Sequence, residues 1–294
     1  MPKRRTRTPL VGLTAAAFLL AACEAAPPTI PEIQLSSREF AFSLPDTIAG
    51  GLVTVHLTND GQEDHHAQFV RLNDGVTRAR FDSVFEAAMA ALPTEGEAAF
   101  MRLFEIVALA GGPSIVAPGG ATAVTLELDA GEYVLACFVA SPDGVSHLAK
   151  GMRHWLTVTA PPTTMPPPPV ADGTVDMADF AYPTMPEMHA GPMVLEVTNS
   201  GQEPHEIVVM RLEGIGLDQL LSMLMEPPPP GEAPAGPPPF TFVGGMQGLM
   251  PGDRGWVTLD LTPGEYAMIC FIPSPANQGK PHVALGMARA FTVR

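Results

Sequence analysis

The chain has 294 residues, of which 46% are apolar, which is enough for two domains of ordinary size. Its formal net charge is −15, and an acidic chain is a poor binder of phosphate backbones, which argues against nucleic acid as a partner. The 33 prolines are clustered, which predicts loops and linkers rather than long helices.

The first 22 residues have the pattern of an export signal. A basic segment, MPKRRTRTP, precedes the apolar run LVGLTAAAFLLAA, which is too short for a comfortable membrane span. The four residues that end at Cys23, Leu-Ala-Ala-Cys, resemble the bacterial lipobox, in which the cysteine is lipidated and becomes the new N-terminus. The resemblance implies a lipoprotein of the cell envelope, on the periplasmic or extracellular face of a membrane, with residues 23–30 as a flexible tether. An ordinary cleaved signal with a chance cysteine is the alternative.

Residues 31–160 are predicted to form a first β-domain. LVTVHLT at 52–58 and AVTLEL at 123–128 alternate apolar and polar residues, which is typical of strands with one buried face. YVLACFV at 133–139 is apolar almost throughout and predicts a strand in the centre of a sheet.

Two segments interrupt the strand pattern. Residues 78–112 have helical spacing and strong helix formers, which predicts a helical insert of two helices separated at Pro93. A shorter helical segment at 217–225 precedes a proline-rich loop in the second half. Residues 161–172 contain a proline run and predict a semi-rigid linker between two domains.

The second half, residues 173–294, repeats the first. LTNDGQEDHH matches VTNSGQEPHE, and DAGEYVLACFV matches TPGEYAMICFI. The repeat places Cys137 and Cys270 at equivalent points of two domains, so a disulfide between them is not expected.

Each half carries the same four residue types in the same order. A histidine follows an Asn-x-Gly turn, a cysteine ends a strand, a second histidine follows, and a methionine lies five residues beyond it. Each of these residues is common for structural reasons alone, but the recurrence of all four in a chain with three cysteines favours metal ligation. The residues are His65, Cys137, His147 and Met152 in the first half, and His205, Cys270, His282 and Met287 in the second.

This set resembles the metal site of the cupredoxin family, the blue copper proteins such as plastocyanin. In that family two histidines and a thiolate surround copper, and a methionine sulfur lies on a long axial bond. The resemblance implies an all-β fold of two tandem cupredoxin-like Greek-key sandwiches, each with a helical or proline-rich insertion. It also implies one copper ion per domain, with the second domain as the closer match. His66 competes with His65 as a ligand, and the alignment of the halves favours His65.

The segments between the cysteine and the second histidine depart from the family pattern. They contain nine residues, 138–146, in the first half and eleven, 271–281, in the second, where the family usually has a few. A longer segment predicts a more open site, a weaker one, or a loop that binds no metal.

The resemblance implies an exported, lipid-anchored copper-binding protein that transfers electrons or handles copper. The acidic composition suits a redox or copper-donor partner with a basic surface. A metal-free cupredoxin-like module that binds a partner in the envelope is the alternative. Copper oxidases and nitrite reductases also use tandem cupredoxin units, but the chain has neither the His-x-His nor the His-Cys-His motif of the oxidases and few further histidines. An enzyme is therefore not expected.

Overall fold

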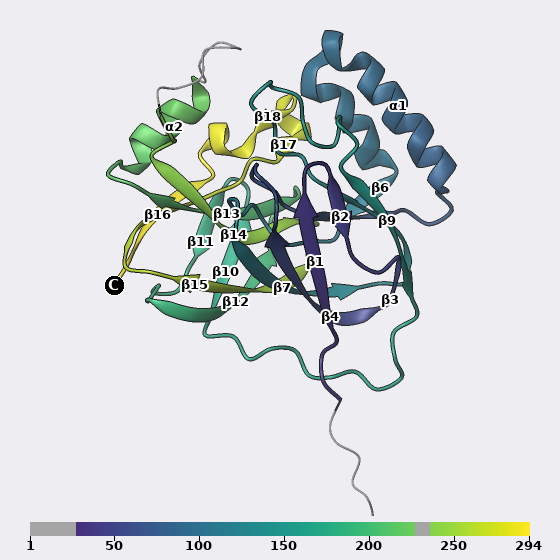
Figure 1. The fold of residues 1–294 in the computed structure, drawn as a ribbon, viewed down its shortest axis with the longest axis horizontal. Helices are drawn as coiled ribbons and strands as arrows, with labels where there is room; N and C mark the ends of the chain where they lie inside the picture. Colours follow the sequence, from purple (N-terminus) through teal and green to yellow (C-terminus); the bar gives the residue numbers. More distant parts are fainter. Residues whose placement is uncertain (1–27, 227–235) are drawn as a thin grey trace, which may run out of the picture.

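The computed structural model describes residues 28–226 and 236–294 and is built mainly of β-strands (Figure 1). The predicted export signal at 1–22, the predicted lipidation site Cys23 and most of the proline-rich loop of the second half lie outside the described residues. No helix within the described ranges is long and apolar enough to cross a membrane.

The strands of the first half form two layers. One layer has the order β2–β1–β4–β7, and the other has the order β3–β9–β8–β5–β6. The bounds are β1 Glu32–Arg38, β2 Ala41–Ser43, β3 Thr47–Ala49, β4 Gly51–Asn59, β5 Gln68–Leu72, β6 Val107–Leu109, β7 Ala121–Leu128, β8 Gly131–Ala136 and β9 Arg153–Thr159.

The second half repeats this plan with the layers β11–β10–β12–β15 and β14–β13–β16–β19. Its strands are β10 Gly173–Ala178, β11 Ala181–Thr184, β12 Gly191–Asn199, β13 His205–Leu212, β14 Phe240–Leu249, β15 Arg254–Leu261, β16 Gly264–Ile269, β17 Pro273–Ser274, β18 Lys280–Pro281 and β19 Ala288–Val293. Residues 160–172, between β9 and β10, form no helix or strand.

The hydrophobic pattern of the sequence agrees with the burial of the strands. In β4, Val53, Val55 and Leu57 are buried, and the residues between them face outward. The last four residues of β8 and of β16 are all buried, because each strand lies between two others and is covered by the opposite layer. The predicted alternation and the predicted central strands are confirmed.

The insert of the first half is helical over most of the predicted range. Helix α1 covers Arg78–Glu95, and a 3₁₀ helix, η1, covers Gly96–Glu105. The prediction is wrong at the C-terminal end, because Val107–Leu109 forms β6 and pairs with β5. The predicted helix boundary at Pro93 is also wrong, since α1 continues through Pro93 to Glu95 and the 3₁₀ helix begins only after Glu95. A proline removes one helical hydrogen bond without always ending the helix. The shorter counterpart in the second half is α2, Leu217–Met225.

The two halves share a sheet. β7 pairs antiparallel with β15, so that two four-stranded layers become one eight-stranded sheet. Val124 pairs with Val257. The two valines are equivalent positions of the repeat, because each precedes the cysteine of its own half by the same number of residues. In the other layer Pro113 bridges Met246, which is again its equivalent. Equivalent residues that contact each other define a local two-fold relation between the halves.

Buried polar contacts also cross this junction. Nε2 of Gln247 donates to Oγ of Ser114 at 3.0 Å, and these side chains too occupy equivalent positions. Nε2 of Gln68 donates to the carbonyl oxygen of Gly248 at 3.1 Å. Satisfied buried polar groups of this kind fix the register of the two halves.

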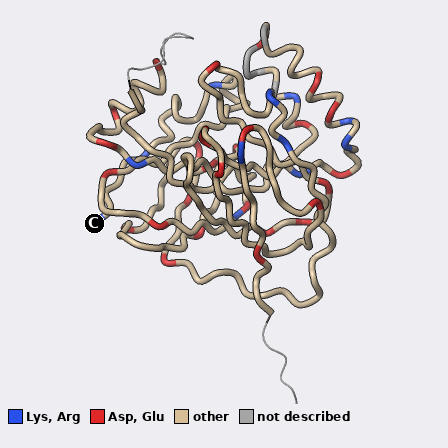
Figure 2. The backbone as a smooth tube through the Cα atoms, viewed as in Figure 1, with Lys and Arg blue, Asp and Glu red and all other residues tan. Residues whose placement is uncertain are grey.

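Figure 1 shows α1 and α2 on opposite sides of one end of the molecule, with the β17–β18 hairpin between them. The linker 160–172 crosses the opposite end, where β1 also begins. In Figure 2 acidic residues are spread over the whole described backbone, whereas many of the basic ones lie near α1. Several of these basic residues are paired, as in the 2.8 Å contact between Arg153 and Asp82.

Candidate metal centres

A cluster of two histidines and a cysteine lies inside the first half, and we call it site one. The Nδ1 atom of His147 lies 3.4 Å from Sγ of Cys137 and 3.1 Å from Nδ1 of His65. Sγ of Cys137 and Nδ1 of His65 are 3.9 Å apart. All three side chains are fully buried, and each points one potential ligand atom toward the other two.

The second half repeats this cluster as site two. Nδ1 of His282 lies 3.3 Å from Sγ of Cys270 and 3.0 Å from Nδ1 of His205. These three residues are also fully buried, and their potential ligand atoms lie within 4.8 Å of one another. Both cysteines are free thiols, so the structure forms no disulfide from them.

The two predicted methionines lie beside these clusters in the backbone network. Met152 is fully buried; its N–H donates to the carbonyl of His147, and its own carbonyl accepts from the N–H of Cys137. Met287 makes the same two contacts with His282 and Cys270. The backbone of each methionine is therefore held next to the histidine and the cysteine of its half.

The long segment between cysteine and second histidine folds back as a hairpin. In the second half β17 pairs with β18, and the N–H of His282 donates to the carbonyl of Ile272 at 2.9 Å. In the first half Ala140 bridges Ser146, and the N–H of His147 donates to the carbonyl of Val139 at 2.8 Å. The expectation of a more open site is wrong, because these hairpins return each histidine to its cysteine and bury it.

The first histidine of each site is fixed by the Asn-x-Gly turn before it. The side-chain amide of Asn59 donates to the carbonyls of Glu63 and Val116, and its oxygen accepts from the N–H of Gly61. A Cβ atom on Gly61 would lie 2.8 Å from Nε2 of His65, so only glycine lets the turn pack on the imidazole. Asn199 and Gly201 repeat these contacts in the second half.

Four carboxylates that the sequence analysis did not single out lie beside the histidines. They approach the Nε2 atoms, on the far side of each ring from the cysteine, and they form the partly exposed rim of each site. They are Glu39 and Glu63 at site one, and Asp179 and Glu203 at site two. The sequence does contain a signal for these carboxylates, because they recur at matching positions of the two halves. One of each pair lies in REFAF or ADFAY, and the other lies in the Gln-Glu pair after each turn.

Burial governs the protonation of the metal-free clusters. It raises the pKa of the Cys137 thiol to about 12 and that of the Cys270 thiol well above its ordinary value. Burial also lowers the pKa of His65 and His282. The thiols of the metal-free sites are therefore neutral, and burial favours the neutral form of His65 and His282; each cysteine becomes a ligand once its thiol loses its proton.

The residue after the first histidine lies behind the cysteine and differs between the halves. His66 does not join the cluster; its Nε2 accepts from the N–H of Phe138 at 2.8 Å. At the equivalent place, the carboxylate of Glu206 accepts from the N–H of Phe271 at 2.8 Å. Burial lowers the pKa of His66 to about 3 and raises that of Glu206 to about 7.

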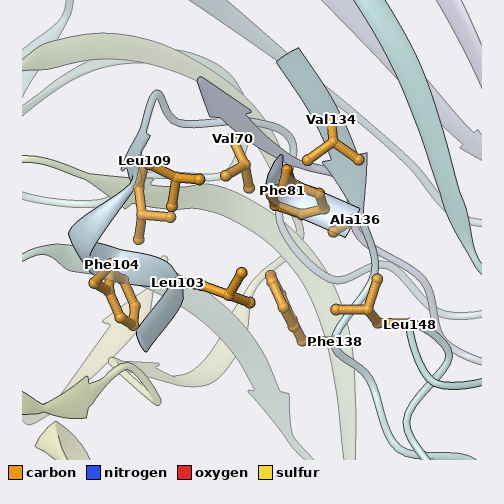
Figure 3. A pocket seen from close by; sticks show the side chains of 10 residues that line it. Val70, Phe81, Leu103, Phe104, Leu109, Val134, Ala136, Phe138 and Leu148 are labelled. Atoms are coloured by element: carbon orange, nitrogen blue, oxygen red, sulfur yellow. The ribbon is translucent and has the colours of Figure 1, made fainter. Parts of the chain in front are cut away.

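An apolar cavity of about 60 Å³ lies between the helical insert and the sheet beside site one (Figure 3). Phe138 and Leu148, which directly follow Cys137 and His147, line it together with Phe81 of α1 and other apolar side chains of η1 and the sheet. The insert thus packs against the residues next to the ligand positions, while Phe138 remains 45% exposed.

The chemistry of the donor set fits a copper ion. Thiolate and thioether are soft ligands that suit Cu(I), and imidazole suits both common oxidation states of copper. At His147, His205 and His282 a carboxylate within hydrogen-bond range of Nε2 holds the ring so that Nδ1 faces inward.

No protein-family model matches this chain, and none of the curated proteins matches it. Solved structures do. Auracyanin of Roseiflexus castenholzii is 22% identical, with 45% of this chain and 99% of that chain covered and a TM-score of 0.29. A multicopper oxidase is 16% identical over 90% of this chain and 88% of that one, with a TM-score of 0.23. A copper nitrite reductase of Nitrosomonas europaea is 11% identical over 90% of this chain and 94% of that one, with a TM-score of 0.26.

The predicted all-β fold class is confirmed by the strand orders, which give two layers of strands in each half. The prediction that the chain is not an enzyme is contradicted, because solved chains that match 90% of its length are copper enzymes. At these TM-scores the matches assign no particular reaction to this chain.

Proposed function

We propose that this chain is a copper redox protein that binds one copper ion in each half. The proposed ligands are His65, Cys137, His147 and Met152 in site one, and His205, Cys270, His282 and Met287 in site two. The observation that carries the proposal is the convergence of two Nδ1 atoms and one Sγ atom, all fully buried, at equivalent places in both halves.

Bound copper would supply a one-electron couple between Cu(I) and Cu(II). The protein's own contribution is a rigid frame. His65 comes from the segment before β5 and His205 is the first residue of β13, whereas the other residues of each site come from the segment that follows β8 or β16. Because strands and hairpin hydrogen bonds hold these segments, the ligand atoms need little movement when the charge of the ion changes.

Copper titration of the purified protein tests the proposal. We expect close to two equivalents to bind and a strong visible absorption from thiolate-to-copper charge transfer. Cys270→Ser should remove the contribution of site two, and Cys137→Ser that of site one. If the double variant binds copper as well as the unchanged protein does, the proposal fails and a metal-free binding module becomes the better interpretation.

We further propose that the halves are tandem domains, residues 31–160 and 173–294, joined by the linker 161–172. The matching strand orders of the two halves and their equivalent contacts support this division. The proposal also includes export, cleavage before Cys23 and attachment to a membrane by lipid on that cysteine. Mass spectrometry of the mature N-terminus tests this part, and an unmodified Cys23 in the membrane-extracted protein would contradict it.

The orientation of the molecule supports a role for such an anchor. β1 begins at the end of the molecule opposite the β17–β18 hairpin (Figure 1). A membrane anchor that precedes β1 would therefore leave the ligand hairpins facing away from the lipid. The rim carboxylates are partly exposed there, which suits a redox or copper-donor partner with a basic surface. Association with such a partner should weaken as the salt concentration rises.

A further inference from the structure

The second histidine of each site contacts a carboxylate in the same way. Nε2 of His147 lies 2.9 Å from the carboxylate of Glu63. Nε2 of His282 lies 3.0 Å from the carboxylate of Glu203. Because the residue types and the distances match, these pairs do not distinguish site one from site two.

The first histidines do differ. Nε2 of His205 lies 2.6 Å from Oδ1 of Asp179, which is a short hydrogen bond. Nε2 of His65 lies 3.6 Å from the nearest oxygen of Glu39, which is beyond hydrogen-bond range, and this buried nitrogen has no hydrogen-bond partner among the described residues.

The difference arises from one methylene group. Glu39 and Asp179 occupy equivalent positions, and each accepts hydrogen bonds from two consecutive backbone N–H groups of the following turn. In site two the oxygen that accepts from the turn also reaches the imidazole of His205. In site one the longer side chain satisfies the turn but stops short of the ring of His65.

We propose that Asp179 is a positioning residue that gives site two the lower reduction potential of the two centres, an inference that rests on the proposed copper function. An imidazole that donates its Nε2 proton to a carboxylate is a more basic ligand through Nδ1. The more basic ligand favours Cu(II) over Cu(I). In site one only one histidine has a carboxylate within hydrogen-bond range of Nε2, whereas in site two both histidines have one.

Redox titration of single-site proteins tests the proposal. Cys137→Ser leaves site two alone, and Cys270→Ser leaves site one alone. At the same ambient potential we expect the ratio of Cu(II) to Cu(I) to be about tenfold higher in site two, which corresponds to about 59 mV for a one-electron couple.

Charge-conserving exchanges separate Asp179 from other differences between the sites. Asp179→Glu in the site-two protein should lower the ratio of Cu(II) to Cu(I) by about the same factor, and Glu39→Asp in the site-one protein should raise it. Glu206 is the other acidic residue that distinguishes site two, so Asp179→Glu is repeated in a Glu206→Gln background. If Asp179 causes the change in the ratio of Cu(II) to Cu(I), that change should persist in the Glu206→Gln background.

A second readout needs no metal. In the metal-free protein, nitrogen NMR should show Nε2 of His205 protonated and hydrogen-bonded, with a signal that moves in Asp179→Glu. Nε2 of His65 should move toward this signal in Glu39→Asp.

The outcomes separate the two proposals. Failure of both single-site proteins to bind copper refutes the proposed function, and this inference with it. Copper binding with equal potentials, with the order reversed, or with no response to Asp179→Glu overturns the inference and leaves the proposed function intact. An unchanged His205 signal in metal-free Asp179→Glu also overturns it.

Discussion

Glu206 and His66, at equivalent positions behind the two cysteines, should give the metal-free protein two opposing pH dependences of stability. The pKa of Glu206 rises from 4.5 to about 7 on burial, so between these values the folded state retains a proton that the unfolded state has lost. Stability is then lost as the pH rises. At about 1.36 kcal/mol for each pKa unit, the contribution amounts to about 3 kcal/mol.

His66 acts in the opposite direction. Its pKa falls from 6.5 to about 3, so between these values the unfolded state binds a proton that the folded state excludes. Stability is then lost as the pH falls, by up to about 1.4 kcal/mol per pH unit. Each side chain accepts one backbone N–H, from Phe271 or Phe138, and glutamine can accept the same hydrogen bond without titrating.

The assay is urea unfolding of the metal-free protein at several values from pH 4.5 to pH 8. Relative to the unchanged protein, Glu206→Gln should gain stability as the pH rises from 4.5 to 7 and then level off. His66→Gln should gain relative stability as the pH falls below 6.5. The reasoning is refuted if either difference in unfolding free energy stays constant across the range, or if the two variants change in the same direction.

Three further outcomes are expected. Gly245→Ala should destabilise the fold by on the order of 3 kcal/mol in thermal unfolding, because the backbone has φ of +130° and a Cβ atom would lie 2.0 Å from the carbonyl oxygen of Ile207. Gly216→Ala is the comparison: a Cβ there meets open space, and because Gly216 is the N-cap of α2 the change should cost only about 0.5–1 kcal/mol. Tyr266→Phe removes a 2.8 Å hydrogen bond to a backbone carbonyl and should cost about 1 kcal/mol by the same assay. Copper binding at pH 7 to the Cys270→Ser protein should release about one proton from the thiol of Cys137, and calorimetry in buffers of different ionisation enthalpy that detects no release would contradict thiolate ligation.

The positions of the two candidate sites could be predicted because their signals are local and occur twice. A histidine after an Asn-x-Gly turn and a cysteine at the end of an apolar strand keep their order in both halves. Strand alternation in β4 and the apolar runs of β8 and β16 were likewise visible, because the two-residue period follows directly from the pleat.

The carboxylates beside the histidines could not be predicted in the same way. Glu39 and Asp179 differ in length and lie far from the ligand positions in sequence, in a chain with 31 acidic residues. Only the fold brings β1 and β10 next to the turns that carry the first histidines. The end of the helical insert was missed for a related reason, because Val107–Leu109 becomes a strand through pairing with β5, a contact between distant segments.

The join between β7 and β15 has a consequence for anyone who divides the protein. Expressed alone, either half would present one long strand with its row of amide and carbonyl groups unpaired. Such a fragment is expected to self-associate through that exposed border, with two identical copies re-creating the pairing that Val124 and Val257 make in the intact chain. An ancestral single-domain form would have had the same means of becoming a homodimer.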